Sequence, residues 1–250
     1  ENSRKIFLSN GQAPKAGDIH RQPALAKTLR AIANRGEEAF YQGEVAEQIV
    51  AYLQGRGGLH TLDDFATTQA DYVKPISTDY RGHEIVECPP NGQGIIALEI
   101  FNILSEFRMR ALHPLGVERF HIEAEATRLA FRDRAAFLAD PALAEVPVEH
   151  LLSKNYAKGL HQLITMDRAM TQLPTPGETP HADTVYLTVV DEDRNAISFI
   201  NSIFHSFGSG LLDAHTGVLL NNRGASFVID PLHPNCIAPR KRPMHTIIPG

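Results

Sequence analysis

Thr184 stands where a proline-rich segment gives way to an apolar run, and this junction is where the chain can do chemistry. Three prolines and a glycine fall within residues 173–180, a composition typical of an exposed linker that is easily cut. A cut between Asp183 and Thr184 would leave a threonine whose own α-amine can act as general base for its hydroxyl. The competing interpretation is an ordinary strand start, because β-branched residues favour strands.

The composition is that of a globular protein. The chain has 250 residues, 43% of them apolar, and a net charge of −5, which allows one large domain or two small ones. No basic arm or Lys/Arg-rich helix is present, so we expect no nucleic-acid partner. The apolar runs, such as residues 94–100, are far shorter than the roughly 20 residues of a membrane span. We therefore expect no membrane partner either.

The sequence holds no metal-binding or cofactor-binding pattern. Cys88 and Cys236 are far apart and form no CxxC pair, although a disulfide between them stays open. The histidines form no HExxH motif, and His121 lacks the downstream cysteine pair of a zinc deaminase. The glycine-rich turn at residues 89–94 matches no phosphate-loop motif, which favours tight packing over a phosphate cradle. We expect neither a metal nor a cofactor.

Hydrophobic periodicity predicts the elements that must position Thr184. We expect an irregular lead-in over residues 1–20. We expect helices over residues 23–35, 37–43, 44–54, 62–68, 95–107, 117–139 and 154–166, and strands over 73–80, 83–88, 185–190, 196–200 and 218–220. Bulky residues on both faces of the strand at 185–190 predict a sheet covered on both sides.

Two side-chain patterns lie on the helix predicted at residues 117–139. The side expected to be buried carries Phe120, Ala124, Phe131, Ala135 and Leu138. The Arg132–Asp133–Arg134 run allows an acid/base cluster, although a solvated or salt-bridged face is the commoner meaning of such a run.

Several short motifs occur in an order and spacing that resemble the γ-glutamyltransferase (γ-glutamyl transpeptidase) family, in the branch that includes cephalosporin-acylase-like proteins. The motifs are Gln22-Pro23-x-Leu25-Ala26, Ala39-Phe40-Tyr41-x-Gly43, Tyr80-Arg81-Gly82, Pro89-Pro90-Asn91-Gly92-Gln93-Gly94, Arg132-Asp133-Arg134, Asp140-Pro141, Asp183-Thr184, Phe207-Gly208-Ser209-Gly210, Gly217-Val218-Leu219-Leu220-Asn221-Asn222 and Lys241-Arg242-Pro243. The resemblance covers nearly the whole chain.

This resemblance implies an α+β fold, the four-layer αββα sandwich of N-terminal-nucleophile hydrolases, here incomplete. It implies a proenzyme that cuts itself between Asp183 and Thr184. Residues 1–183 then form the mainly helical end of the large subunit, and residues 184–250 form the mainly β start of the small subunit. The expected partners are the other part of the proenzyme, a γ-glutamyl or related acyl amide substrate, and water or an amino acid as acceptor.

The resemblance also assigns site residues and shows departures from the family pattern. Ser202 replaces a threonine that supports the amine of the nucleophile, and Phe204 replaces an asparagine. Arg223 and Ser226 replace acceptor residues that hold the amino group of the substrate, and His245 and Thr246 replace a pair of serines. Because arginine cannot accept a hydrogen bond from an ammonium group, we expect altered headgroup recognition. A dicarboxylate-type acyl group, held bidentately by Arg223, fits that change.

We expect this sequence to be the central part of a longer protein, with an arginine-bearing segment before Glu1 and an oxyanion-hole glycine pair after Gly250. The 250-residue chain alone is then weakly active or inactive, because losing one oxyanion donor typically costs about 10² to 10³ in rate. The compartment stays open between cytoplasmic and exported. Two other functions stay open as well: an acylase of a β-lactam side chain or poly-γ-glutamate, and a non-catalytic binding protein.

Overall fold

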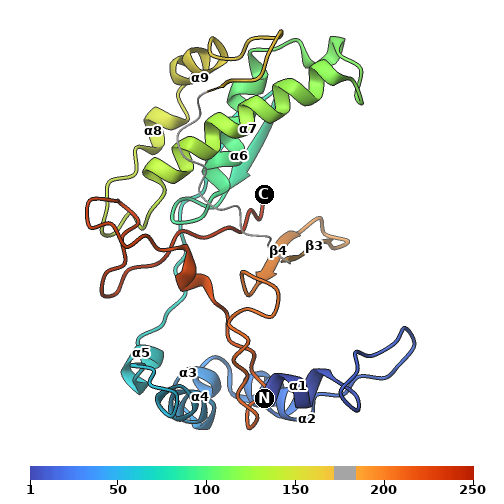
Figure 1. Cartoon of the computed structure of the whole chain (residues 1–250), viewed down its shortest axis with the longest axis vertical. Coiled ribbons are helices and arrows are strands. Elements are labelled where there is room, and N and C mark those ends of the chain that lie inside the picture. Colours follow the sequence, from blue (N-terminus) through green and yellow to red (C-terminus); the bar gives the residue numbers. More distant parts are fainter. Residues whose placement is uncertain (172–183) are drawn as a thin grey trace. The chain divides into compact units, whose positions relative to one another are not determined.

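The computed structural model describes residues 1–171 and 184–250 (Figure 1). These residues form two compact units, each built from segments far apart in the sequence. Unit 1 contains residues 1–72 and 205–222, and unit 2 contains the described residues of 73–204 together with 223–250. Each unit therefore takes chain from both sides of Thr184. The expected division at 183/184 concerns cleavage, and it stays a prediction.

Unit 1 is helical. The helices predicted at residues 23–35 and 44–54 have these bounds, and those predicted at 37–43 and 62–68 are shorter than predicted. The helices of unit 1 are α1 (Asn2–Phe7), α2 (Pro23–Arg35), α3 (Glu38–Tyr41), α4 (Glu44–Gln54) and α5 (Leu62–Ala66). Proline fits the first turn of α2, and Gly36 follows its end with a φ of 70° that favours glycine. Thr61 and Asp64 form a capping box at the start of α5. Helix α1 corrects the expectation of an irregular lead-in.

The core of unit 1 forms around one face of α4. Val45, Ile49 and Leu53 are buried and pack with Val218 and Leu220. The expected strand at 218–220 was wrong: Leu219 makes only an isolated bridge with Leu212. These residues serve as core side chains rather than as part of a sheet.

Unit 2 combines helices with two separate antiparallel hairpins. Its elements are β1 (Ile76–Tyr80), β2 (His83–Glu87), α6 (Gly94–Ser105), η1 (Met109–Ala111), α7 (Val117–Phe137), α8 (Val148–Leu151), α9 (Lys154–His161), β3 (Thr184–Val190), β4 (Ala196–Ser202) and η2 (Arg223–Ser226). Strand β1 pairs with β2, and β3 pairs with β4. Helices α6 and α7 lie side by side (Figure 1), and their apolar faces form the core with α9.

The face expected to be buried on helix α7 is only partly correct: Leu138, just past the end of the helix, is buried and Phe131 packs in the same cluster, but Ala124 and Ala135 are exposed. The buried face carries Ile122, Ala126, Leu129 and Ala130 at helical spacing, whereas Phe120 is 55% exposed. Asp133 is also buried, where Arg132 pairs with it at 2.9 Å. The Arg132–Asp133–Arg134 run is therefore salt-bridged, as expected, but it is not a solvated surface.

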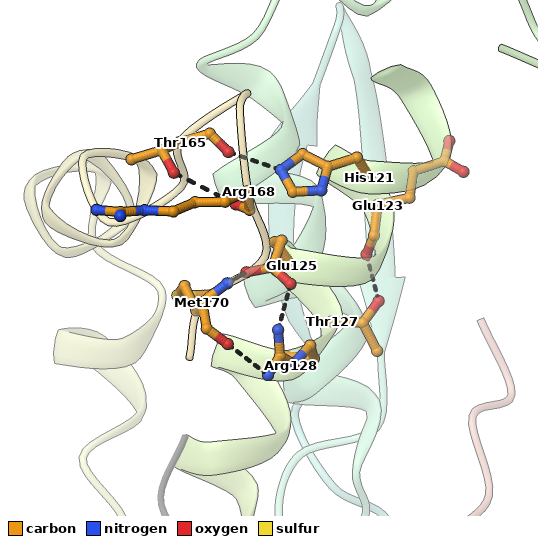
Figure 2. Close-up of polar contacts among 8 residues, drawn as sticks. All are labelled: His121, Glu123, Glu125, Thr127, Arg128, Thr165, Arg168 and Met170. Carbon is orange, nitrogen blue, oxygen red and sulfur yellow. Dashed lines mark hydrogen bonds and ion pairs between the residues drawn. The ribbon is translucent and has the colours of Figure 1, made fainter. Parts of the chain in front are cut away.

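The segment that follows α9 folds back against α7 (Figure 2). His121 Nε2 lies 2.7 Å from the carbonyl oxygen of Thr165, and the Glu125 carboxylate accepts a 2.9 Å hydrogen bond from the amide of Met170. Arg128 pairs with Glu125 and also donates to the Met170 carbonyl. These contacts hold residues 165–170 against α7.

The β3–β4 hairpin matches the predicted strands but is not covered on both faces. Val185, Leu187 and Val189 are between 43% and 68% exposed, and Tyr186 on the other face is 47% exposed. Among residues 1–171 and 184–250, β3 has β4 as its only strand partner, which explains the exposure. The fold is α+β, as predicted, and the four-layer sandwich stays a prediction for the full-length protein.

Candidate active site around Thr184

Thr184 is the first residue of β3, the position that the sequence predicted for it. In the antiparallel register of the hairpin it pairs with Ser202, the last residue of β4. Asp183, on the other side of the predicted cleavage point, lies outside the described residues. The two expected catalytic residues are therefore brought together at the open end of one hairpin.

Ser202 links the hairpin to the chain that follows it. Its Oγ accepts a 3.0 Å hydrogen bond from the amide of Phe204, which uses an oxygen lone pair and leaves the hydroxyl proton available to donate. Its carbonyl oxygen accepts a 3.4 Å hydrogen bond from Nη2 of Arg223. Hydrogen bonds therefore hold both the side chain and the backbone of Ser202, the residue opposite Thr184.

Arg223 brings a positive charge to this end of the hairpin. It begins η2, it is 7% exposed, and its Nη1 donates to Oγ1 of Thr246 at 3.1 Å. Burial lowers the pKa of its guanidinium from the ordinary value, although arginine stays charged at any physiological pH. A planar guanidinium held this way suits a carboxylate rather than an ammonium group.

His245 is neutral near neutral pH. Burial, and secondly the charge of Arg223, lower the pKa of its imidazole to about 4. Its backbone is held by the glycine-rich turn, because its amide donates to the carbonyl of Asn91 and its carbonyl accepts from the amide of Gln93, both at 2.8 Å. Of Ser202, Arg223, Ser226, His245 and Thr246, only Arg223 is therefore charged near neutral pH.

The hydroxyl of Ser226 lies within hydrogen-bond distance of two backbone carbonyls. Its Oγ lies 2.9 Å from the carbonyl of Arg223 and 2.8 Å from that of Met244. The side chain of Asn235, which the sequence analysis missed, bridges the same two segments: Nδ2 donates to the carbonyl of Ser226 at 2.7 Å and Oδ1 accepts from the amide of Met244 at 3.2 Å. Ser226 and Asn235 hold η2 against the segment that carries His245 and Thr246.

The glycine-rich turn at residues 89–94 packs against this same segment. Gly92 forms a parallel bridge with His245, and the amide of Gly92 donates to the carbonyl of Pro89. Two amides that a phosphate cradle would need, those of Gly92 and Gln93, therefore have partners already, which supports the packing interpretation. The glycine-rich motif marks this turn in the sequence, but Asn91 and Gln93 were not predicted as residues that form the site.

The two cysteines are unpaired thiols. Cys88 is exposed and Cys236 is partly exposed, and both are free. Within the described ranges, no helix is long and apolar enough to cross a membrane.

Comparison with known proteins places the chain in a family. The family model described as Gamma-glutamyltranspeptidase matches residues 1–250, the whole chain. The chain belongs to the gamma-glutamyltranspeptidase family. The predicted resemblance is confirmed.

Three similar proteins carry different names within this family. The glutathione hydrolase-like YwrD proenzyme of Bacillus subtilis is 41% identical over 98% of this chain and 46% of its own length. The oxamate amidohydrolase proenzyme of Klebsiella pneumoniae is 36% identical over 98% of this chain and 46% of its own length. The crystal structure of a cephalosporin acylase from Bacillus halodurans is 42% identical, with a TM-score of 0.87 over 98% of this chain and 44% of that chain.

These similarities support a hydrolase or transpeptidase proenzyme at the level of the family. This chain spans about half the length of the gamma-glutamyltranspeptidase relatives it matches. The activity, substrate and partners of the whole protein are therefore matters for proposal.

Proposed function

We propose that the full-length protein is a γ-glutamyltransferase-like proenzyme that cleaves itself before Thr184 and then uses this threonine as its nucleophile. The observation that supports this most is the place of Thr184 at the first position of β3, paired with Ser202. A residue at a strand start, next to a hydroxyl-bearing neighbour, suits a nucleophile with a free amine. Family membership gives this local arrangement a chemical meaning.

The bond-making and proton-transfer steps of acylation use the hydroxyl and the α-amine of the threonine itself. After cleavage, Oγ1 of Thr184 attacks the amide carbonyl and its proton passes to the α-amine of the same residue. The amine then gives the proton to the leaving nitrogen, the C–N bond breaks, and an acyl ester remains on Thr184. Water or an amino acceptor attacks the ester, releases the acid or the new amide, and restores the hydroxyl. In this role the hydroxyl of Ser202 supports the amine.

The acyl group that fits this site best carries a carboxylate and no ammonium group. A γ-glutamyl group carries both, and its ammonium needs acceptors or anions around it. Arg223 offers donors at that position, and Thr246 and the neutral His245 add uncharged polar groups. A glutaryl-like or shorter dicarboxylate monoamide therefore fits better than a γ-glutamyl amide. The names of two relatives, an oxamate amidohydrolase and a cephalosporin acylase, are in keeping with amides other than glutathione.

Self-cleavage is tested by the intact mass of the full-length protein. We expect the wild type to split between Asp183 and Thr184, and Thr184→Ala to stay whole. Thr188→Ala, which changes another threonine of β3, is the matched control and is expected to split like the wild type. A wild-type protein that never splits would contradict the proposal and favour a binding protein derived from the family.

The substrate class is tested by a panel on the matured full-length protein. We expect glutaryl-p-nitroanilide to be turned over with a higher kcat/KM than γ-glutamyl-p-nitroanilide. The reverse order would support a glutathione-type substrate and contradict the role given to Arg223. Because this chain covers about half of its relatives' length, we expect little or no turnover of either compound by the 250-residue chain alone.

A further inference from the structure

The glycine-rich turn at residues 89–94 holds a distant segment of unit 2 in place through backbone contacts. Nδ2 of Asn91 donates to the carbonyl of Pro243 at 2.6 Å, and the amide of His245 donates back to the Asn91 carbonyl. The amide of Gln93 then donates to the carbonyl of His245. Residues 243–246 are thus bound along the turn much as one strand binds another.

The side chain of Gln93 extends this contact in two directions. Its Oε1 accepts a 2.9 Å hydrogen bond from Nη1 of Arg134, and its Nε2 donates to the carbonyl of Thr246 at 2.7 Å. Only one orientation of the amide satisfies both partners, because a guanidinium cannot accept and a carbonyl cannot donate. Arg134 is itself 9% exposed, and its guanidinium lies 4.3 Å from the ring centroid of Phe131. The amide of Gln93 is therefore held by a fixed neighbour on α7.

The hydrogen bonds continue from Thr246 to the hairpin. Oγ1 of Thr246 accepts from Nη1 of Arg223, and Nη2 of Arg223 donates to the carbonyl of Ser202, which is paired with Thr184. A continuous series of contacts thus runs from α7 through the turn to the residue opposite Thr184. Gln93 is the link that fixes the backbone of Thr246.

We propose that Gln93 is a positioning residue that, through Thr246, fixes the direction in which the Arg223 guanidinium meets the acyl headgroup of the substrate. The inference rests on the proposed function, in which Arg223 and Thr246 bind that headgroup. Glutamine is suited to the task because it accepts from Arg134 and donates to Thr246 at once. Glutamate would keep the first contact, but it would turn a negative oxygen towards the carbonyl of Thr246.

The test compares Gln93→Glu with wild type in the matured full-length protein, with glutaryl- and γ-glutamyl-p-nitroanilide as substrates. We expect self-cleavage to proceed, KM for the preferred substrate to rise about 5- to 30-fold and kcat to change less than about threefold, because a misdirected headgroup contact weakens binding more than chemistry. Gln54→Glu is the matched control: Nε2 of Gln54 also donates to a backbone carbonyl at 2.8 Å, that of His60, at an exposed site of unit 1. It should leave KM unchanged.

A second variant, Gln93→Met, removes both hydrogen bonds without adding charge and should also raise KM. Combined with Arg223→Lys, either variant should raise KM by less than the product of the two single effects, because both act on one contact. Unchanged KM in both Gln93 variants, effects that multiply with Arg223→Lys, or loss of folding in both would overturn the inference while leaving the proposed function intact. A wild type that neither cleaves nor turns over either compound would overturn both.

Discussion

The guanidinium of Arg223 lies over the ring of Phe204, with 5.1 Å between its central carbon and the ring centroid. Phe204 is 1% exposed and its φ is 80°, in the left-handed region that non-glycine residues rarely adopt. A bulky residue stays in that conformation only when its surroundings stabilise it. Burial of the ring, its contact with a cation, and the hydrogen bond from its amide to Oγ of Ser202 all stabilise this conformation.

Phe204→Leu should therefore destabilise the full-length protein. The loss of ring contacts and of the cation–π interaction predicts a decrease of about 1–3 kcal/mol in the free energy of unfolding, measured by urea denaturation. Phe207→Leu is the control, because Phe207 has a similar φ of 59° but is 55% exposed. Its effect should be clearly smaller. An equal decrease in the free energy of unfolding for both substitutions would contradict the stabilising role given to the buried ring of Phe204.

Arg223→Gln should weaken binding of a carboxylate-bearing acyl group. A charge-assisted hydrogen bond contributes about 1.5–3 kcal/mol, so we expect KM for glutaryl-p-nitroanilide to rise roughly ten- to hundredfold. Steady-state kinetics of the matured protein measure this. Arg240→Gln, a change at an exposed arginine of unit 2, should leave KM as it is. If Arg223→Gln also lowered KM for γ-glutamyl-p-nitroanilide, this would further support the proposal that Arg223 disfavours an acyl group with an ammonium.

The same substitution should change the titration of His245. Burial is the larger cause of its lowered pKa and the charge of Arg223 the smaller, so in Arg223→Gln the pKa should rise from about 4 but stay below the ordinary 6.5. NMR of the imidazole signals measures this, and Lys241→Gln, which removes another positive charge nearby in the sequence, should have no such effect. Because the folded-state pKa is depressed, the contribution of His245 to stability is present above about pH 6.5 and is lost as pH falls towards 4. A wild-type His245 that titrates at 6.5 would contradict the burial argument.

Local sequence patterns predicted most elements, and non-local contacts set the limits of that prediction. Helix α4 has the predicted bounds Glu44–Gln54 because its apolar residues repeat at helical spacing. The buried face of α7 was predicted only in part: Leu138 is buried as expected, but the buried face also carries Glu125 and Asp133 as ion-paired carboxylates, and a search for apolar residues passes over such positions.

The candidate site shows the same division. The strand start at Thr184 follows from local sequence, as does its pairing partner Ser202, once the hairpin turn is recognised. The contact of Gln93 with Thr246 joins residues 153 positions apart, and no periodicity encodes such a contact. The motif that contains Gln93 is recognisable in the sequence, but the contact between Gln93 and Thr246 could be identified only from the structure.

Glu99 and Glu125 are two buried glutamates with opposite surroundings. Glu125 is 2% exposed and pairs with Arg128 and the amide of Met170 (Figure 2). Glu99 is 0% exposed, and neither of its carboxyl oxygens has a hydrogen-bond partner among the described residues. Burial, and then the neighbouring carboxyl of Asp133, raise the pKa of Glu99 to about 10, against a smaller opposing effect of Arg132. Glu99 therefore carries a proton in the folded state at neutral pH.

Glu99→Gln should stabilise the full-length protein at alkaline pH, and Glu125→Gln should destabilise it. Because the folded-state pKa of Glu99 lies above its unfolded value of 4.5, its contribution to stability is complete below about pH 4.5 and is lost as pH rises towards 10. Glutamine resembles the protonated acid and does not titrate, so the gain from Glu99→Gln should grow between pH 5 and pH 9 in urea denaturation. Glu125→Gln instead leaves Arg128 without its anionic partner, a loss of about 1–3 kcal/mol. A Glu99→Gln variant whose free energy of unfolding follows that of the wild type at every pH would show that Glu99 is ionised in the folded protein.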